Sequence, residues 1–332
     1  MKVNPSYHSS RKKEKTEEVY LAGLAQGDRY ILSDLITLAE SIHPEKRKIA
    51  TDVLSHCPTT EHTIRIGITG TPGVGKSTFL ESYGMMLIEQ GYKVAILAID
   101  PASILQKGSI LGDKTRMTEL SKNTSAYIRP SSSQRMLGGV NAYTLESMRL
   151  CEAAGYDIVI VETVGVGQSE TSVSNLVDLF TLLVLPGAGD EVQGIKRGIM
   201  EMADFILVNK ADGERREMAE KSKRQYQDAS RLMRQHKKGL TTIVDTISGL
   251  EGRGLELLWQ NMKDSISSMK ETGYWQENRK LQEMNWLEEK TKSWILEKHF
   301  YDNKIYHKLL DIKSDVETDD LNIFNAWKIV TS

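Results

Sequence analysis

The spacing of hydrophobic positions in this 332-residue chain changes twice along its length. From Asp28 the spacing is helical, with steps of four, three and four residues. The positions that set it are Ile31, Leu35, Leu38 and Ile42. Asp28 is suited to cap this helix, and Pro44 with Glu45 is typical of the first turn of a second one. Residues 1 to about 16 are polar and mostly basic. We therefore predict a tail and a helical extension over residues 1–62.

From Thr63 the pattern becomes one of short apolar runs rich in β-branched residues, separated by helical stretches. Six runs are expected to form strands, at residues 64–69, 94–99, 158–161, 180–185, 205–208 and 241–247. Buried strands that alternate with helices are typical of a mostly parallel sheet with both faces covered. The sequence therefore predicts an α/β domain over residues 63–262.

After Gly254 the spacing is helical again, which predicts a C-terminal helical arm over residues 263–332. Four apolar residues fall on one face of this arm: Met284, Leu287, Trp294 and Ile295. Three tryptophans also lie in it, at positions 275, 286 and 294. Two interpretations remain open at this point. The aromatic side chains pack the arm onto the main domain, or they form a dimer interface.

Composition narrows the class of protein. The chain is 39% hydrophobic and 27% charged, with a formal net charge of -2, which argues against nucleic-acid binding through a broad basic surface. No apolar run approaches the ~18 residues that span a bilayer, so we expect no membrane partner. The first fifteen residues lack the apolar core of a signal peptide, and two cysteines are too few for a disulfide framework. A cytoplasmic location is predicted.

The strongest motif follows the first predicted strand. Residues Gly70–Ser77 match the pattern G-x-x-x-x-G-K-[ST] between a strand and a helix, the context that defines a phosphate-binding P-loop. Main-chain N–H groups of the loop and the following helix N-terminus would bind phosphate. Lys76 would reach the β- and γ-phosphates, and the Ser77 hydroxyl would ligate Mg²⁺. The predicted nucleotide contacts are Gly70, Thr71, Pro72, Gly73, Val74, Gly75, Lys76, Ser77 and Thr78.

Two later strands end in a carboxylate, as a P-loop metal site requires. Asp100 ends the run at 94–99, and Glu162 ends the run at 158–161. Gly165 completes an acid-x-x-Gly ending whose free N–H could meet the γ-phosphate, which makes this loop a candidate switch. Asp100 and Glu162 are therefore candidate Mg²⁺ ligands alongside Ser77.

A base-reading motif, Asn209-Lys210-Ala211-Asp212, follows the run at 205–208. The Asp212 carboxylate can accept hydrogen bonds from N1–H and the exocyclic amine of guanine, which adenine does not offer in that arrangement. The residues Ser248, Gly249 and Leu250 follow the last predicted strand, where GTPases carry a further guanine-contacting loop. The sequence thus predicts a P-loop NTPase G domain that binds GTP and GDP.

Longer stretches carry a more specific resemblance. Residues 100–103, 108–117, 162–170 and 186–198 resemble the MeaB/ArgK family of GTPase chaperones of adenosylcobalamin-dependent methylmalonyl-CoA mutase. The resemblance covers about residues 18 to 298. It implies a homodimer that hydrolyses GTP slowly alone and faster with an acyl-CoA mutase. It also implies that the protein gates cofactor delivery and removal of damaged cofactor.

The resemblance also assigns residues. It places Asp113 in a first switch near Mg²⁺ with Asp100, and it puts Glu162 where most GTPases have Asp. Residues 187–196 resemble a third switch that couples the nucleotide state to the mutase, with Gln193 and Lys196 as its candidate functional residues. The catalytic set expected from motif and resemblance together is Lys76, Glu162, Gln193 and Lys196. Gln168 and Arg197 are further candidates for positioning water.

The chain departs from the family pattern at Lys107 and at residues 134–136, which leaves the identity of the partner mutase open. Two other functions are considered. A nickel-insertion GTPase would need thiolate or imidazole ligands, for which His56, Cys57 and Cys151 are the nearest candidates. An ATP-dependent kinase linked to basic amino-acid transport, a role long attached to the ArgK name, is opposed by Asp212.

Overall fold

The computed structural model describes residues 15–41, 43–58, 60, 62–100, 117–132, 141–163, 169–187, 197–231 and 240–301, with six further residues between 311 and 329. Its centre is a seven-stranded sheet in the order β3-β2-β4-β1-β5-β6-β7, and every pairing is parallel. The strands are β1 (Ile64–Gly70), β2 (Val94–Asp100), β3 (Ala126–Ser132), β4 (Ile158–Thr163), β5 (Leu179–Val184), β6 (Phe205–Val208) and β7 (Ile243–Thr246). The predicted α/β class with a parallel sheet is confirmed.

The sheet places the P-loop strand near its middle. β1 pairs with β4 on one side and with β5 on the other, so it is covered by hydrogen bonds along both edges. All six predicted strands are present. The sequence analysis missed β3, which lies at the edge beside β2 and contains Pro130. An edge position tolerates proline because one side of the strand needs no ladder hydrogen bond.

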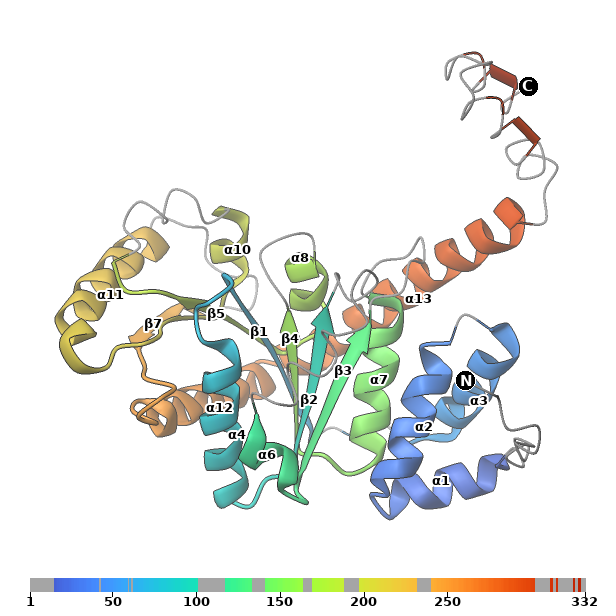
Figure 1. Cartoon of the computed structure of the whole chain (residues 1–332), viewed down its shortest axis with the longest axis horizontal. Helices are drawn as coiled ribbons and strands as arrows, with labels where there is room; N and C mark the ends of the chain where they lie inside the picture. Colours follow the sequence, from blue (N-terminus) through green and yellow to red (C-terminus); the bar gives the residue numbers. More distant parts are fainter. Residues whose placement is uncertain are drawn as a thin grey trace, which may run out of the picture.

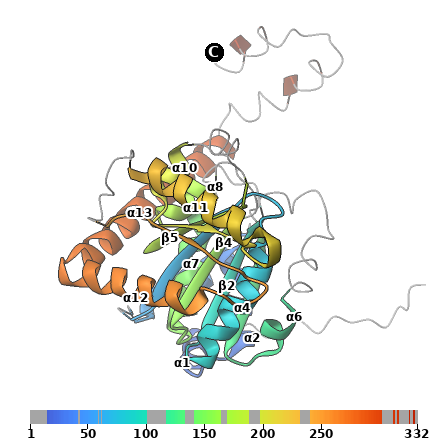
Figure 2. The same cartoon turned by 90° about the vertical axis from the view of Figure 1, so that its left-hand side faces the viewer.

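Helices cover both faces of the sheet (Figures 1 and 2). One apolar core joins α4, α6 and α12 to the sheet, and the other joins α7, α8, α10, α11 and the N-terminal helices to its opposite face. The helices are α1 (Glu17–Ala25), α2 (Arg29–Ala39), α3 (Pro44–His56), α4 (Lys76–Glu89), α6 (Thr118–Lys122), α7 (Asn141–Ala153), α8 (Ser169–Ser174), α10 (Arg197–Met202), α11 (Arg216–Arg231), α12 (Leu255–Glu271) and α13 (Tyr274–Tyr301). No helix within the described ranges is long and apolar enough to cross a membrane.

The N-terminal extension forms three helices packed beside α7 (Figure 1). Asp28 caps α2 as predicted, since its side chain accepts from the N–H groups of Tyr30 and Ile31. Pro44 starts α3, also as predicted. The sequence analysis did not anticipate α1, whose first turn is acidic and whose Tyr20 and Leu24 are buried.

The long helix α13 connects the two faces of the sheet. Trp275 near its start belongs to the core beneath α4 and α12, whereas Trp286 packs against the opposite core. Between them, Arg279 and Gln282 contact the main chain just before β1 and β5. The helix therefore passes along the amino edge of the sheet, opposite the P-loop. The expected boundary at residues 262/263 falls inside α12, which is continuous across it.

Aspartates organise this amino edge. Asp157, Asp178 and Asp204 directly precede β4, β5 and β6, and each carboxylate accepts a main-chain N–H from the start of a neighbouring strand. The donors are the N–H groups of Lys93, Arg65 and Phe180, at 2.8, 2.7 and 2.7 Å. Strand ends here are thus fixed by charge-assisted hydrogen bonds.

Candidate nucleotide site

The P-loop leaves β1 at Gly70 and enters α4 at Lys76, as the motif predicts. Gly75 has φ +94°, and a Cβ there would lie 2.9 Å from the Nδ2 atom of Asn209. Both the left-handed backbone and the close approach require glycine. No side chain caps the N-terminus of α4. Its first N–H groups and its helix dipole are therefore available to an anion.

Lys76 lies over this loop. Its Nζ donates to the main-chain oxygens of Gly70 at 2.7 Å and Thr71 at 3.4 Å. Ser77 and Thr78 follow in the first turn of α4, where Ser77 is half-buried and Thr78 is exposed. The ammonium, the hydroxyls and the helix N-terminus thus share one end of α4. This arrangement suits the phosphates of a nucleotide.

Asn209 joins the P-loop to the predicted base-contacting loops. It is buried at the end of β6, and its Nδ2 donates to the main-chain oxygen of Val74 at 2.9 Å. Its Oδ1 accepts from the N–H of Gly249 at 3.1 Å. One amide therefore sets the distance between the phosphate end and the base end of the site.

The two predicted base-contacting segments also meet directly. Ser248 donates through Oγ to the Oδ2 of Asp212 at 3.1 Å, and the N–H of Ala211 donates to the oxygen of Ile247 at 3.0 Å. Lys210 has φ +58°, the one positive φ among described residues other than glycine. Leu250 is 76% exposed beside them. Since one oxygen of the half-buried Asp212 is fixed by Ser248, the carboxylate is oriented before a base arrives.

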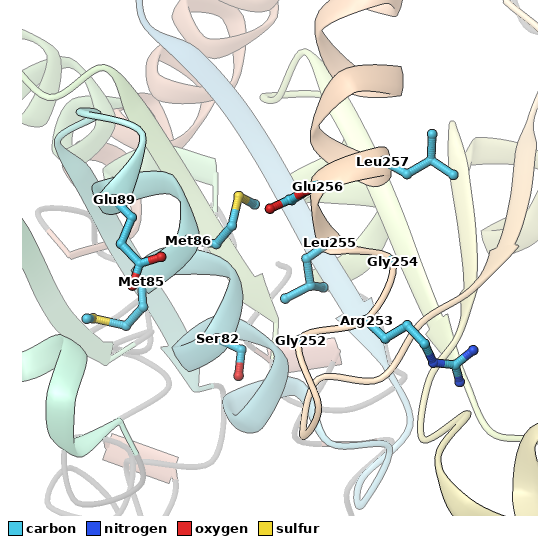
Figure 3. A pocket seen from close by; sticks show the side chains of 10 residues that line it. All are labelled: Ser82, Met85, Met86, Glu89, Gly252, Arg253, Gly254, Leu255, Glu256 and Leu257. Atoms are coloured by element: carbon cyan, nitrogen blue, oxygen red, sulfur yellow. The ribbon is translucent and has the colours of Figure 1, made fainter.

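The Ser248–Leu250 loop rests on α4. Ser82 donates to the oxygen of Gly249 at 2.5 Å, and a Cβ on Gly249 would lie 2.9 Å from the Cα of Phe79. Behind this contact is a cavity of about 560 Å³ between α4 and α12 (Figure 3). Its lining residues are Ser82, Met85, Met86, Glu89 and residues 252–257. It lies behind the base-reading loop and not at the phosphates.

The acidic candidates lie at the carboxyl edge of the sheet. Glu162 is buried on β4, opposite Ile68 of β1 in the strand register. Beside it, Thr163 donates to the Oγ1 of Thr69 at 2.8 Å. Asp100 ends β2, the next strand along. The described residues contain no cluster of three or more acidic, histidine or cysteine side chains that could hold a metal by itself.

That donor set nevertheless fits Mg²⁺. Magnesium in nucleotide sites takes one or two protein oxygens and completes its shell with phosphate oxygens and water. Ser77 offers a hydroxyl and Glu162 a carboxylate, both hard oxygen ligands. When bound, the ion would neutralise charge on the β- and γ-phosphates.

Several candidates lie outside the described residues. These are Asp113, Gly165, Gln168, Gln193 and Lys196. Of the predicted third switch, the structure describes its first residue, Gly187, whose N–H donates to the Oγ of Ser222 at 2.9 Å. The sequence analysis missed two contributors, Ser82 and the bridging role of Asn209. Neither carries a local signal. The partner of Ser82 lies 167 residues away in the chain, and the partners of Asn209 lie 135 and 40 residues away.

Comparisons with known proteins agree with this geometry. The family model for "Methylmalonyl Co-A mutase-associated GTPase MeaB" matches residues 32–304. GTPase ArgK of Escherichia coli (strain K12) is 44% identical over 286 residues, which cover 86% of each chain. The "Methylmalonic aciduria type A homolog, mitochondrial" of Mus musculus is 42% identical over 84% of this chain and 70% of its own.

Among solved structures, one titled "Crystal structure of LAO/AO transport system kinase" superposes with a TM-score of 0.73 at 34% identity, covering 100% of this chain and 98% of the other. The similarity thus extends along most of the chain, and the matched residues 32–304 include the P-loop and the predicted base-contacting segments. The chain belongs to the MeaB family of P-loop GTPases.

Proposed function

We propose that this GTPase is a chaperone of an adenosylcobalamin-dependent acyl-CoA mutase of the methylmalonyl-CoA mutase type. The observation that carries the proposal is the match of residues 32–304 to a family described as mutase-associated. The protein would bind the mutase, gate delivery of its cofactor and assist removal of damaged cofactor. Its nucleotide state would time these steps.

The site supports a division of labour. Lys76, the loop N–H groups and Mg²⁺ would stabilise charge on the transferred phosphoryl group. Ser77, Asp100, Asp113 and Glu162 would hold the metal. Gln193 and Lys196 would link the γ-phosphate to the mutase, so hydrolysis would be slow until the mutase completes the site.

The direct test is GTP turnover by the purified protein, alone and with methylmalonyl-CoA mutase. We expect a low rate alone and a rise of several fold with the mutase. An acyl-CoA enzyme without cobalamin is the matched control protein, and Lys76→Ala is the matched inactive variant. Turnover that is fast alone and unchanged by the mutase would contradict the proposal.

A kinase of amino-acid transport is the second candidate, because one solved relative carries that title. The structure favours guanine over adenine, since Ser248 orients Asp212 for donors that adenine lacks. Competition between GDP and ADP for the nucleotide site separates the two functions. Preference for ADP would support the kinase.

Nickel insertion finds no support in the described residues. Cys151 is buried in the core on α7, and Cys57, which follows α3, packs against the same core. Burial raises the pKa of both thiols, which opposes the thiolate form that a metal needs.

We further propose that α13 mediates homodimerisation. The face that includes Trp275 and Gln282 is buried, whereas five apolar residues on the opposite face are exposed: Leu281, Met284, Leu287, Trp294 and Ile295. The largest of these side chains, Trp294, is 57% exposed. An apolar stripe of this kind on a helix, with an aromatic residue in it, is typical of a protein–protein contact.

Size-exclusion chromatography with light-scattering detection tests the dimer. We expect wild type to have twice the monomer mass. Leu287→Glu with Trp294→Glu should give a monomer that still binds GDP. Lys292→Gln, which changes only an exposed ion-paired position on the same helix, should remain dimeric. A monomeric wild type at micromolar concentration would contradict this proposal.

A further inference from the structure

At the amino edge of the sheet, opposite the P-loop, a buried network of charged side chains joins α13 to β1. Arg279 of α13 is its centre. The Nε and Nη2 atoms of Arg279 donate to the two carboxylate oxygens of Asp178, each at 2.6 Å. Nη2 also donates to the main-chain oxygen of Thr63 at 2.8 Å. Because Thr63 directly precedes β1, one guanidinium ties the helix to the strand that leads to the P-loop.

Asp178 makes a second connection to the same strand. Its Oδ2 accepts from the N–H of Arg65 at 2.7 Å, and its own N–H donates to the oxygen of Arg65 at 2.9 Å. Asp157 and Asp204 make the corresponding carboxylate bond at neighbouring strands. The Asp178 carboxylate, in addition, accepts two hydrogen bonds from the guanidinium of Arg279. Helix α13 is thus bonded to the same carboxylate that holds the start of β1.

The side chain of Arg65 closes the network. Its Nε donates to the Oε1 of Glu152 on α7 at 2.6 Å, and its Nη1 donates to the Oε1 of Gln282 on α13 at 3.0 Å. The Nε2 of Gln282 donates in turn to the oxygen of Val177 at 3.0 Å. Arg65 and Glu152 are each 1% exposed, so water cannot replace a lost partner. Loss of one partner therefore leaves the charge of the other buried and uncompensated.

β1 is suited to carry a displacement to the nucleotide site. It is bonded along both edges, to β4 and β5, and its far end is Gly70 at the start of the P-loop. This seven-residue strand runs without a break from the buried network to the P-loop. It is therefore the path by which a change at its first residues would reach the main-chain groups of the P-loop.

We infer that Arg279 is a positioning residue that couples the seating of α13 to the geometry of the P-loop, through Asp178 and β1. A second protein that contacts the exposed apolar residues of α13 would thereby affect nucleotide binding. Coupling of this kind is reciprocal, so nucleotide binding must also favour the seated helix. The inference rests on the GTPase site and not on the identity of the partner.

The first test is the affinity for GDP, measured by titration with a fluorescent GDP analogue and corrected for the folded fraction. We expect Arg279→Gln to weaken GDP binding about tenfold. Arg279→Lys keeps the charge but loses the bidentate contact, and should give an intermediate value. Lys292→Gln, an exposed position on the same helix, is the control and should bind GDP as wild type does. Unchanged affinity in folded Arg279→Gln would overturn the inference.

The second test needs no variant. Hydrogen exchange of the wild-type amides is followed with and without GDP. We expect GDP to slow exchange in residues 274–286 of α13 as well as in β1 and the P-loop. Slowing confined to the P-loop and the base-reading loops would overturn the inference. A role of Arg279 in stability alone would slow α13 exchange only as much as GDP binding slows the other core helices, because a ligand stabilises the whole fold.

Discussion

The two edges of the central sheet are built in different ways. At the carboxyl edge, the site is made largely from main-chain groups, with glycines and short motifs that are contiguous in the chain. At the amino edge, buried charged and polar side chains meet from segments up to 217 residues apart. The carboxyl edge leaves donors for a ligand, whereas the amino edge satisfies its groups within the protein. A change at the first should alter nucleotide binding directly. A change at the second should alter stability first, and should reach nucleotide binding only through β1.

The largest effect is expected at the amino edge. Arg65→Met leaves Glu152 buried without its closest partner, because the Arg65 Nε–Glu152 Oε1 distance is 2.6 Å and both side chains are 1% exposed. We expect a loss of about 3–5 kcal/mol in the free energy of unfolding, measured by urea denaturation. Arg65→Met combined with Glu152→Gln removes both charges and should recover part of the loss. Full additivity of the two changes would show that the residues do not interact.

The next effect is expected at the P-loop. Lys76→Ala should lower GTP turnover by about 10²–10³-fold, because the ammonium no longer stabilises phosphoryl charge. Its melting temperature should stay near that of wild type, since Lys76 is half-buried and donates to the main-chain oxygens of Gly70 and Thr71 in a surface loop. Lys93→Ala, a lysine remote from the P-loop just before β2, is the control for turnover. A large drop in the melting temperature of Lys76→Ala would contradict the expectation that changes at the carboxyl edge leave stability unchanged.

The base-reading loop offers a change of specificity. Asp212→Asn replaces an acceptor by a donor, so GDP binding should fall by at least roughly 100-fold. Xanthosine diphosphate, which has an oxygen in place of the guanine amine, should bind better to the variant than to wild type. Asp264→Asn on the outer part of α12 is the matched control. Equal loss for both bases would mean that Asp212 acts on the fold and not on the base.

The smallest effect concerns pH. Burial alone would raise the pKa of Glu152, but the guanidinium groups of Arg65 and Arg279 outweigh it and hold that pKa below its usual range. A carboxylate with a lowered pKa in the folded state stabilises above its unfolded pKa of about 4.3, and this contribution is lost as pH falls through the folded value. The stability difference between wild type and Glu152→Gln, measured by urea denaturation, should therefore shrink below about pH 4. A difference that is constant from pH 7 to 3 would contradict the lowered pKa.

Much of the fold was predictable from the sequence because its signals are local. Six of seven strands, the P-loop and the cap at Asp28 follow from short patterns. The edge strand β3 was missed because Arg129 and Pro130 break its apolar run. The Nη2 atom of Arg129 instead donates to Glu40 of the N-terminal extension at 2.7 Å. The pairing of β3 with β2, and the contact of Arg129 with Glu40, join residues that are far apart in the chain, so no local pattern predicts them.

The candidate site divides in the same way. Which residues form the phosphate and base-reading segments was set by the sequence, since each motif is short and contiguous. Only the tertiary structure decided how they are joined, because Asn209 bridges Val74 and Gly249 across 135 and 40 residues. Likewise, sequence spacing predicted a helical arm with Met284, Leu287, Trp294 and Ile295 on one face, but packing decided which face of α13 is buried. Arg279 and Gln282 turn toward the amino edge because their partners are there, and that leaves the face with Trp294 exposed.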